Sequence, residues 1–227
     1  MELERGTTLV LGGTRSGKSR VAEGLASAVA ERSGVGVCYL ATGPAPDGAD
    51  PAWAARVAAH RARRPAGWTT REFGRGPGGP LDLRALRSAL AETTDVCLLD
   101  SLGALVAELL VGAEDAEDHA AGPDEPGPDG PGPDGGVGEA LAGLLEALRA
   151  RGASGRASVV VSEEVGLAVH PPTALGRRFA DQLGALNQAV AAMADQVLLV
   201  VAGRVLPLPP APLVVAPGSA PLGAGPS

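Results

Sequence analysis

The stretch "LVLGGTRSGKSRVAE", residues 9–23, decides the fold. Residues 8–11 form an apolar run typical of a short buried strand, and residues 19–30 fit a helix. Between them, Gly12, Gly17, Lys18 and Ser19 fill every fixed position of the pattern G-x-x-x-x-G-K-[ST]. Glycines let successive backbone N–H groups turn inward around an anion, and the following helix directs its positive end to the same place. The stretch predicts a phosphate-binding loop; the alternative is a glycine-rich turn whose lysine is merely solvated.

The loop also predicts which atoms meet a nucleotide. In loops of this kind the lysine reaches the β- and γ-phosphates, and the serine hydroxyl ligates Mg²⁺. We therefore expect nucleotide binding, with Mg²⁺ or a similar divalent cation held in part by Ser19. The expected phosphate-binding residues are Gly12, Gly13, Thr14, Arg15, Ser16, Gly17, Lys18 and Ser19.

Length and composition are those of one α/β domain with additions. The chain has 227 residues, of which 45% are hydrophobic and only 2% aromatic, so Leu, Val and Ala must fill the core. We expect no membrane span and no leader, because no apolar run is long enough and the N-terminus lacks a charged-then-apolar pattern. Cys38 and Cys97 lie in strand-like apolar runs, which favours buried free thiols and a cytoplasmic location.

The net charge of −7 belongs to one segment of the chain. Eight acidic residues and no Lys or Arg lie between Val111 and Gly138, and the remainder holds 19 basic and 18 acidic residues. The charge of the fold itself is therefore nearly balanced, and we expect no nucleic-acid partner.

Two low-complexity segments interrupt the predicted organisation. The sequence "GPDEPGPDGPGPDGG" from Gly122 repeats Gly-Pro-Asp without apolar periodicity, which predicts a disordered acidic insertion at 112–138. The Pro-rich residues 209–227 predict a disordered tail, and either segment could instead recruit a partner. We expect a single catalytic domain over 1–208. A homo-oligomer is compatible with the sequence, which shows no obvious interface.

Strand and helix patterns alternate along the rest of the chain. A mostly parallel sheet covered by helices on both faces is therefore predicted, an α/β fold like that of P-loop NTPases. The expected strands are 7–11, 35–41, 96–100, 157–162, 196–202 and 204–208, and the expected helices are 18–32, 51–63, 82–92, 102–110, 139–150 and 174–193.

Ligands of such sheets bind beyond the carboxyl ends of the strands, where this chain places polar residues. Ala41, Thr42 and Gly43 follow one strand, Asp100 ends "VCLLD", and Glu163 and Glu164 follow another. Asp100 has the placement of a Mg²⁺-holding carboxylate, although it could instead cap the next helix. Glu164 and Asp100 are the candidates for the base of a kinase step.

His60 points to a reaction other than the direct phosphoryl transfer of a simple phosphate-loop kinase. It lies on an expected helix that Pro51 begins and Pro65 ends, where Arg56, Arg63 and Arg64 share or flank its face. Cationic neighbours disfavour imidazolium, so the ring keeps a lone pair that can attack phosphorus and form a phosphoramidate. The spacing predicts nucleotidyl transfer; a partly buried packing histidine is the alternative.

The chain resembles the bifunctional adenosylcobinamide kinase/adenosylcobinamide-phosphate guanylyltransferase family of cobalamin biosynthesis. The resemblance covers nearly all of residues 8–203 apart from the insertion. The matching segments are "LGGTRSGKSRVAE", "YLATG", "RVAAHRARRPAGWTTRE", "LLDSLGALVAELL" and "SEEVGLAVHPPTALGRRFADQLGALNQAVAAMADQVLLVVAG". Two departures stand out: Glu163 occupies a position that is often Asn in the family, and Ala180 one that is usually Arg.

The resemblance implies a two-step enzyme. The aminopropanol hydroxyl of adenosylcobinamide would be phosphorylated by ATP or GTP. GMP would then move from GTP to adenosylcobinamide phosphate through guanylylated His60, giving adenosylcobinamide-GDP and pyrophosphate. The implied nucleotide site adds Ala41, Thr42, Gly43, Arg61, Ala62, Arg63, Arg64, Glu72 and Asp100 to the loop, and Ser19 and Asp100 would hold the metal. A plain P-loop small-molecule kinase and a non-catalytic nucleotide-binding regulator are the alternatives.

Overall fold

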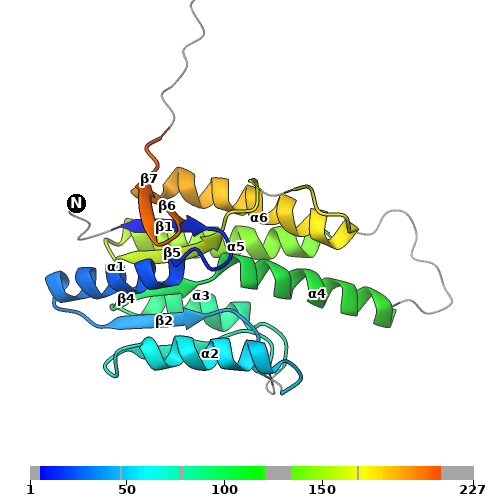
Figure 1. Ribbon diagram of the computed structural model, residues 1–227, viewed down its shortest axis with the longest axis horizontal. Coiled ribbons are helices and arrows are strands. Elements are labelled where there is room, and N and C mark those ends of the chain that lie inside the picture. The colour runs from blue at the N-terminus through cyan, green and yellow to red at the C-terminus, as the bar shows by residue number, and fades with distance from the viewer. Residues whose placement is uncertain (1–5, 47, 77–78, 121–133, 168, 211–227) are drawn as a thin grey trace, which may run out of the picture.

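The computed structural model describes residues 6–46, 48–76, 79–120, 134–167 and 169–210. Its centre is a seven-stranded sheet in the order β3-β2-β4-β5-β1-β6-β7 (Figure 1). All neighbouring strands are parallel except β6 and β7, which form an antiparallel pair. The strands are β1 (Thr7–Gly12), β2 (Val37–Ala41), β3 (Thr69–Glu72), β4 (Val96–Asp100), β5 (Ser158–Glu163), β6 (Gln196–Val201) and β7 (Arg204–Pro207).

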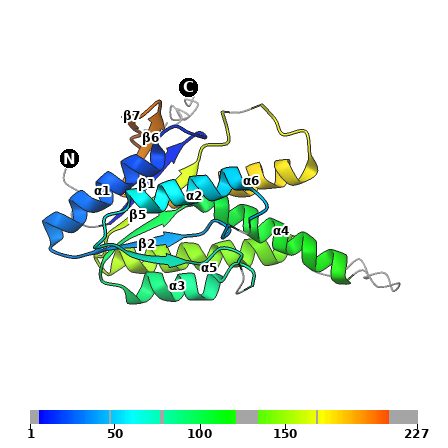
Figure 2. The ribbon, with the colours of Figure 1, turned by 60° about the horizontal axis from the view of Figure 1, so that its bottom comes forward.

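Helices cover both faces of the sheet, as expected for strands that are apolar throughout (Figures 1 and 2). Alternate strand residues such as Leu9 and Leu99 join the core beneath α3, α4, α5 and α6, whereas Val10 and Leu98 pack with Ala22 of α1 on the other face. The helices are α1 (Lys18–Ser33), α2 (Pro51–Arg63), α3 (Leu83–Glu92), α4 (Leu102–Ala120), α5 (Asp134–Ala153) and α6 (Ala174–Met193).

Helix α2 differs from the others because it contributes no buried residue to the core. Its start is fixed locally: the Asp50 side chain accepts hydrogen bonds from the backbone N–H groups of Ala52 and Trp53, and Pro51 occupies the first helical position. The helix ends before Pro65, as predicted. The residues that carry His60 are thus ordered by capping and surface contacts rather than by the hydrophobic core.

The predicted fold class is confirmed, with two differences in detail. Strand β3 was not predicted, because its residues "TTRE" are mostly exposed and show no apolar pattern. Helix α4 continues to Ala120 and α5 begins at Asp134, so residues 112–120 and 134–138 are helical and the predicted bounds of the insertion were wrong at both ends. Residues 121–133, and 211–227 of the predicted tail, lie outside the described residues.

Cys38 and Cys97 are buried and free, as predicted. Burial raises the pKa of both thiols, that of Cys97 to about 12. None of the helices within the described ranges combines the length and the apolar character that a membrane crossing requires.

Candidate active site

The predicted phosphate loop joins β1 to α1, at the carboxyl edge of the sheet. Gly17 caps α1 with a left-handed backbone (φ 95°), a conformation that glycine adopts without strain, and its carbonyl accepts the hydrogen bond of Val21. Gly12 lies so close to Ser16 and to the Val200 carbonyl that a side chain there would collide with both. The glycines of the motif are therefore required by the geometry of the turn.

The turn between β6 and β7 supports the loop from outside. The backbone N–H of Gly203 donates to the Ser16 carbonyl at 2.8 Å, and Gly203 also packs against Gly17. Ala202 and Gly203 both have positive φ, as expected for a two-residue hairpin turn. The C-terminal hairpin thus holds the loop in its curved form.

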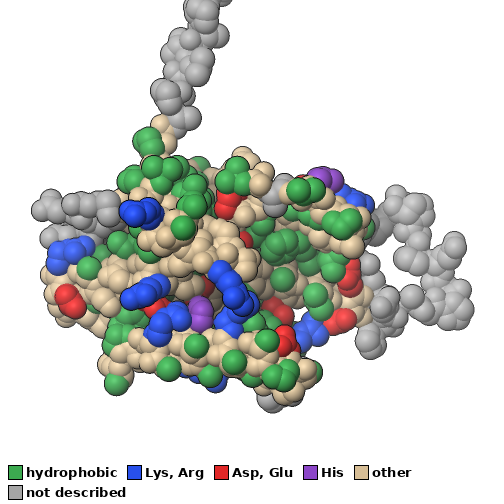
Figure 3. Space-filling model, viewed as in Figure 1, with side chains coloured by type: hydrophobic (Ala, Val, Ile, Leu, Met, Phe, Trp, Pro, Cys, Tyr) green, Lys and Arg blue, Asp and Glu red, His purple; other side chains and the backbone are tan. Residues whose placement is uncertain are grey.

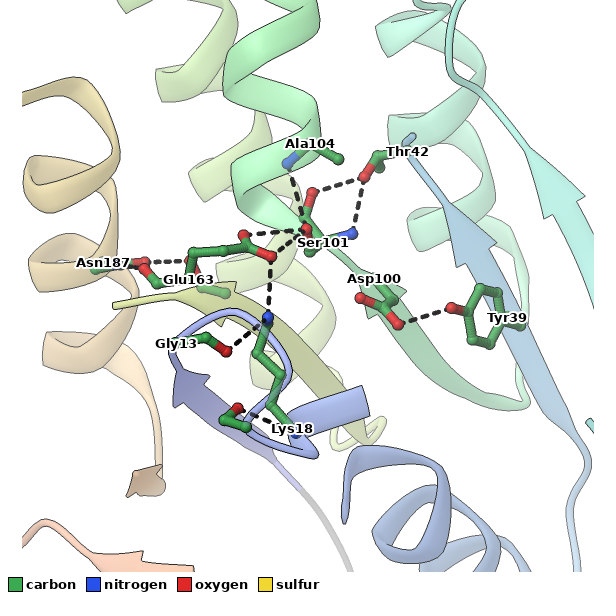
Figure 4. A network of polar contacts seen from close by, with 11 residues as sticks. Gly13, Lys18, Tyr39, Thr42, Asp100, Ser101, Ala104, Glu163 and Asn187 are labelled. Carbon is green, nitrogen blue, oxygen red and sulfur yellow. Dashed lines mark hydrogen bonds and ion pairs between the residues drawn. The ribbon is translucent and has the colours of Figure 1, made fainter. Parts of the chain in front are cut away.

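Lys18 of the loop is paired with Glu163 at the end of β5 (Figure 4). The ammonium lies 3.2 Å from Glu163 Oε1 and 3.5 Å from the Gly13 carbonyl, and its side chain is only 12% exposed. Ser101 Oγ lies 3.2 and 3.1 Å from the two carboxylate oxygens of Glu163 and donates to them. The lysine that would bind phosphate is thus paired with a carboxylate of the chain itself.

A second polar contact fixes the end of β5 against α6. Asn187 Nδ2 donates to the Glu163 carbonyl at 2.9 Å, and Ser162 Oγ donates to Asn187 Oδ1 at 2.6 Å. Both side chains are buried, so these hydrogen bonds satisfy groups that would otherwise be costly to bury. The backbone that carries Glu163 is therefore held from two elements.

Asp100 ends β4, and its carboxylate accepts a hydrogen bond from the Tyr39 hydroxyl at 2.7 Å. Burial and then the negative charge of Asp100 raise the pKa of Tyr39, while the Arg64 guanidinium stacks 3.5 Å from the tyrosine ring centroid. Asp100 does not cap α4: Ser101 does, since its hydroxyl accepts from the Ala104 N–H at 3.2 Å. The alternative reading of Asp100 as a helix cap was wrong.

Thr42 and Gly43 hold the segment after β2. The Thr42 hydroxyl donates to the Ser101 carbonyl at 2.6 Å and accepts from the Ser101 N–H at 2.9 Å. The Thr42 side chain is fully buried, and through these two hydrogen bonds it links the segment after β2 to the segment after β4. Gly43 contacts the Trp53 ring of α2, and Trp53 Nε1 donates to the Pro44 carbonyl at 3.0 Å. The segment after Ala41 thereby anchors α2 to the sheet.

His60 of α2 is half-buried, and its pKa is lowered. Burial is the largest cause and Arg63 the next; Asp100 and Glu23 act in the opposite direction, and Arg64 again lowers the pKa. A neutral imidazole was predicted from the arginines alone, so the direction is confirmed and its main cause is revised to burial. Figure 3 shows Lys and Arg side chains around a histidine just above α2.

The arginines near His60 are held by acids of other elements. Arg61 donates to Glu72 Oε1 of β3 at 3.0 and 2.6 Å, and Arg63 donates to the Glu23 carboxylate of α1 at 3.3 and 3.0 Å. Arg64 caps the end of α2, and Ala62 is exposed. These pairs place the predicted arginines on the side of α2 that faces α1 and the edge strand.

The structure revises which carboxylate after β5 faces the loop. The predicted candidate, Glu164, accepts a hydrogen bond from the Gly166 N–H at 2.6 Å and so caps its own turn. Glu163, which the sequence placed at the end of the strand but did not name as a candidate base, contacts Lys18 and stands in register with Gly12 on the neighbouring strand. The sequence offered one indication of this role: Glu163 is the last residue of β5, the strand that pairs with β1.

Among the described residues, no group of three or more His, Cys, Asp and Glu side chains is arranged to hold a metal ion by itself. Two of the predicted oxygen donors stand on the carboxyl side of the sheet: the Ser19 hydroxyl in the first turn of α1, and the half-buried Asp100 carboxylate at the end of β4. Mg²⁺ typically takes one or two protein oxygens and completes its shell with phosphate and water, so this donor set fits Mg²⁺ delivered with a nucleotide.

A mostly parallel sheet with a glycine-rich loop between its interior strand β1 and helix α1 defines a P-loop nucleotide-binding protein of the α/β class. The family model described as cobinamide kinase / cobinamide phosphate guanyltransferase matches residues 8–208. The chain belongs to this family.

Curated relatives match along almost their whole length. The bifunctional adenosylcobalamin biosynthesis protein CobP of Pseudomonas aeruginosa is 38% identical over 205 residues, which cover 90% of this chain and 98% of the relative. The bifunctional adenosylcobalamin biosynthesis protein CobU of Salmonella typhimurium is 34% identical over 200 residues, covering 86% and 95%. Among solved structures, the flagellar accessory protein FlaH of Methanocaldococcus jannaschii aligns at 12% identity and a TM-score of 0.43, over 88% of this chain and 74% of that one.

Proposed function

We propose that the protein phosphorylates adenosylcobinamide with ATP or GTP and then transfers GMP from GTP to the product, releasing pyrophosphate. Membership of the cobinamide kinase / cobinamide phosphate guanyltransferase family over residues 8–208 supports both steps. The observation that carries the proposal is the combination of a phosphate loop with a histidine of lowered pKa, His60, whose charge environment includes Asp100 at the loop's edge of the sheet.

In the kinase step, the loop holds the triphosphate of the donor. Backbone N–H groups between Gly12 and Ser19 surround the β-phosphate, and Lys18 leaves Glu163 to meet the β- and γ-phosphates. The aminopropanol hydroxyl of adenosylcobinamide attacks the γ-phosphorus, the bond to the β-phosphate oxygen breaks, and the hydroxyl proton passes to a base. The products are adenosylcobinamide phosphate and a nucleoside diphosphate.

In the guanylyl step, a ring nitrogen of neutral His60 attacks the α-phosphorus of GTP and pyrophosphate leaves. The lowered pKa keeps the nucleophile in its reactive form near neutral pH. A phosphate oxygen of adenosylcobinamide phosphate then attacks the phosphoramidate, which releases His60 and gives adenosylcobinamide-GDP. Arg61, Ala62, Arg63 and Arg64, with Glu72, are proposed to line this part of the nucleotide site.

Ser19 and Asp100 are proposed to hold Mg²⁺ together with the nucleotide phosphates. Mg²⁺ would neutralise charge on the phosphates during both transfers. The Tyr39 hydroxyl, which donates to Asp100 Oδ2, would keep this carboxylate oriented. We also propose a cytoplasmic location, which the two free buried thiols support because free thiols persist in a reducing compartment.

The test is the intact mass of the protein after incubation with GTP and Mg²⁺. The wild type should gain the mass of one GMP, in an acid-labile, base-stable adduct, and the H60A variant should gain none. His170 is exposed and serves as the matched control, so the H170A variant should be labelled like the wild type. A wild type that transfers the γ-phosphate to adenosylcobinamide without forming an adduct would instead indicate a plain kinase.

A further inference from the structure

Lys18 is the only lysine among the 227 residues of the sequence, so the chain has a single side-chain ammonium group. In a loop of this type, that group binds the β- and γ-phosphates of the nucleotide. In this structure it contacts two acceptors of the chain itself, a carboxylate oxygen of Glu163 at 3.2 Å and the carbonyl oxygen of Gly13 at 3.5 Å. A nucleotide must therefore compete with Glu163 for this ammonium.

The Glu163 carboxylate is held in place by groups other than Lys18. Ser101 Oγ lies 3.2 and 3.1 Å from its two oxygens, and the carboxylate packs against the first turn of α4, whose positive end stabilises negative charge. A methyl group at Gly103 would overlap a carboxylate oxygen, so glycine permits this close approach. Asn187 Nδ2 donates to the backbone carbonyl of Glu163 at 2.9 Å. These contacts do not involve Lys18, so the carboxylate remains beside the loop when Lys18 turns to a phosphate.

The charge of Glu163 opposes the binding of phosphates that reach Lys18. A carboxylate in contact with the ammonium that binds the β- and γ-phosphates lies close to those phosphates as well, and placing like charges side by side costs free energy. The exposed fractions of the Lys18 and Glu163 side chains are 12% and 28%, so solvent and salt screen these charges only in part. The α-phosphate is bound by backbone N–H groups of the loop, beyond the reach of the lysine. The cost therefore falls on ligands that carry a β- or γ-phosphate and spares a nucleoside monophosphate.

We propose that Glu163 is a specificity-determining residue of the nucleotide site, which weakens the binding of ligands with a β- or γ-phosphate by competing for Lys18. The inference rests on the proposed function, which makes GTP and ATP the ligands of the loop. It affects both steps, because the kinase step leaves a nucleoside diphosphate in the loop and the guanylyl step leaves pyrophosphate. The return of the Glu163 carboxylate to Lys18 favours the release of either product, so that the same loop can bind the next nucleotide.

The E163Q variant tests the inference, because glutamine keeps the size of the side chain and removes its charge. Binding is measured by isothermal titration with H60A as the parent protein, so that no GMP is transferred during the experiment. The Kd for GTP with Mg²⁺ should be at least ~10-fold lower in E163Q than in the parent, with a comparable decrease for pyrophosphate with Mg²⁺. The Kd for GMP should stay within about twofold, because its phosphate lies beyond Lys18. E164Q is the matched control: it removes the same charge one residue away and should bind GTP within about threefold of the parent.

The single lysine allows a second measurement that needs no nucleotide. Protein made with isotope-labelled lysine gives one set of side-chain NMR signals, that of Lys18. In the nucleotide-free protein, these signals should have different chemical shifts in E163Q and in the parent, whereas those of E164Q should coincide with the parent.

Three results would contradict the inference. Unchanged Lys18 signals in E163Q would show that the ion pair does not form. Changed signals without a decrease in the Kd for GTP would show that Glu163 does not compete with the nucleotide. Equal decreases in the Kd for GTP and for GMP would show an effect on the whole site rather than on Lys18. A wild type that binds GTP but transfers neither the γ-phosphate nor GMP would instead contradict the proposed function.

Discussion

Replacing Arg151 with methionine should destabilise the protein strongly, although the residue lies at the amino edge of the sheet, away from the loop. Arg151 is 2% exposed, and its guanidinium donates to carbonyl oxygens of Leu90, Thr93, Asp95 and Ala157, the first two at 2.9 and 2.7 Å. These carbonyls belong to the end of α3 and to the segments that lead into β4 and β5. One side chain therefore joins three elements where their regular hydrogen bonding stops.

The magnitude follows from the carbonyls that methionine would leave without a donor. The Ala157 carbonyl also accepts the Cys97 N–H at 3.1 Å, so three carbonyls, those of Leu90, Thr93 and Asp95, lose the arginine as donor. An acceptor that loses its partner on burial costs about 1–3 kcal/mol, so three of them amount to at least ~3 kcal/mol. Burying a guanidinium also costs free energy, which is why burial lowers the pKa of Arg151. Replacing the guanidinium with an apolar side chain removes this cost and so offsets part of the lost stability. We expect a net loss of about 3 kcal/mol, which corresponds to a decrease in Tm of roughly 9 °C for a domain of this size.

The assay is urea unfolding followed by circular dichroism, with a thermal scan as a second measurement. The control is R149M on the same helix, because Arg149 is 59% exposed and pairs with Glu146 one turn away at the surface. This control should change the free energy of unfolding by less than ~0.5 kcal/mol. A loss below ~1 kcal/mol in R151M, or an equal loss in both variants, would refute the reasoning that unpaired carbonyls set the cost.

Two further predictions concern the site. The first concerns the pH dependence of the rate of His60 guanylylation, measured at low GTP so that it reports the free enzyme. The rate should fall on the acid side with an apparent pKa below the ordinary histidine value of about 6.5. This apparent pKa should be higher in R63Q, because the variant removes the positive charge of Arg63, which lowers the pKa of His60, and frees Glu23, which raises it. An unchanged apparent pKa would show that Arg63 does not influence the titration of His60. The second is that the G103A variant should lower the Kd for GTP at least ~3-fold in isothermal titration, because a methyl group at this position displaces the Glu163 carboxylate from Lys18. A Kd equal to that of the parent protein would mean that the close approach at Gly103 does not hold the carboxylate against Lys18.

Most of the fold could be predicted because the signals are local. Strands such as 96–100 are apolar throughout, and the glycines and lysine of residues 12–18 define a loop by backbone geometry alone. Strand β3 escaped prediction because an edge strand needs only one partner and little apolar character, and "TTRE" obtains its pairing from β2.

The candidate site was less accessible to sequence reasoning because it depends on side-chain direction. Sequence placed both Glu163 and Glu164 after a strand, but only the three-dimensional structure shows one carboxylate at Lys18 and the other in its own turn. The arginines near His60 were visible as a pattern, whereas the burial that most lowers its pKa is a tertiary property.

The interior place of β1 has a consequence for biosynthesis. The strand at residues 7–12 is made long before its two neighbours, residues 158–163 and 196–200. Both edges of this apolar strand therefore stay unpaired until those residues have left the ribosome, and the phosphate loop lacks the hydrogen bond from Gly203 until then. Products truncated before residue 158 would leave both edges of β1 without their partners, which favours aggregation.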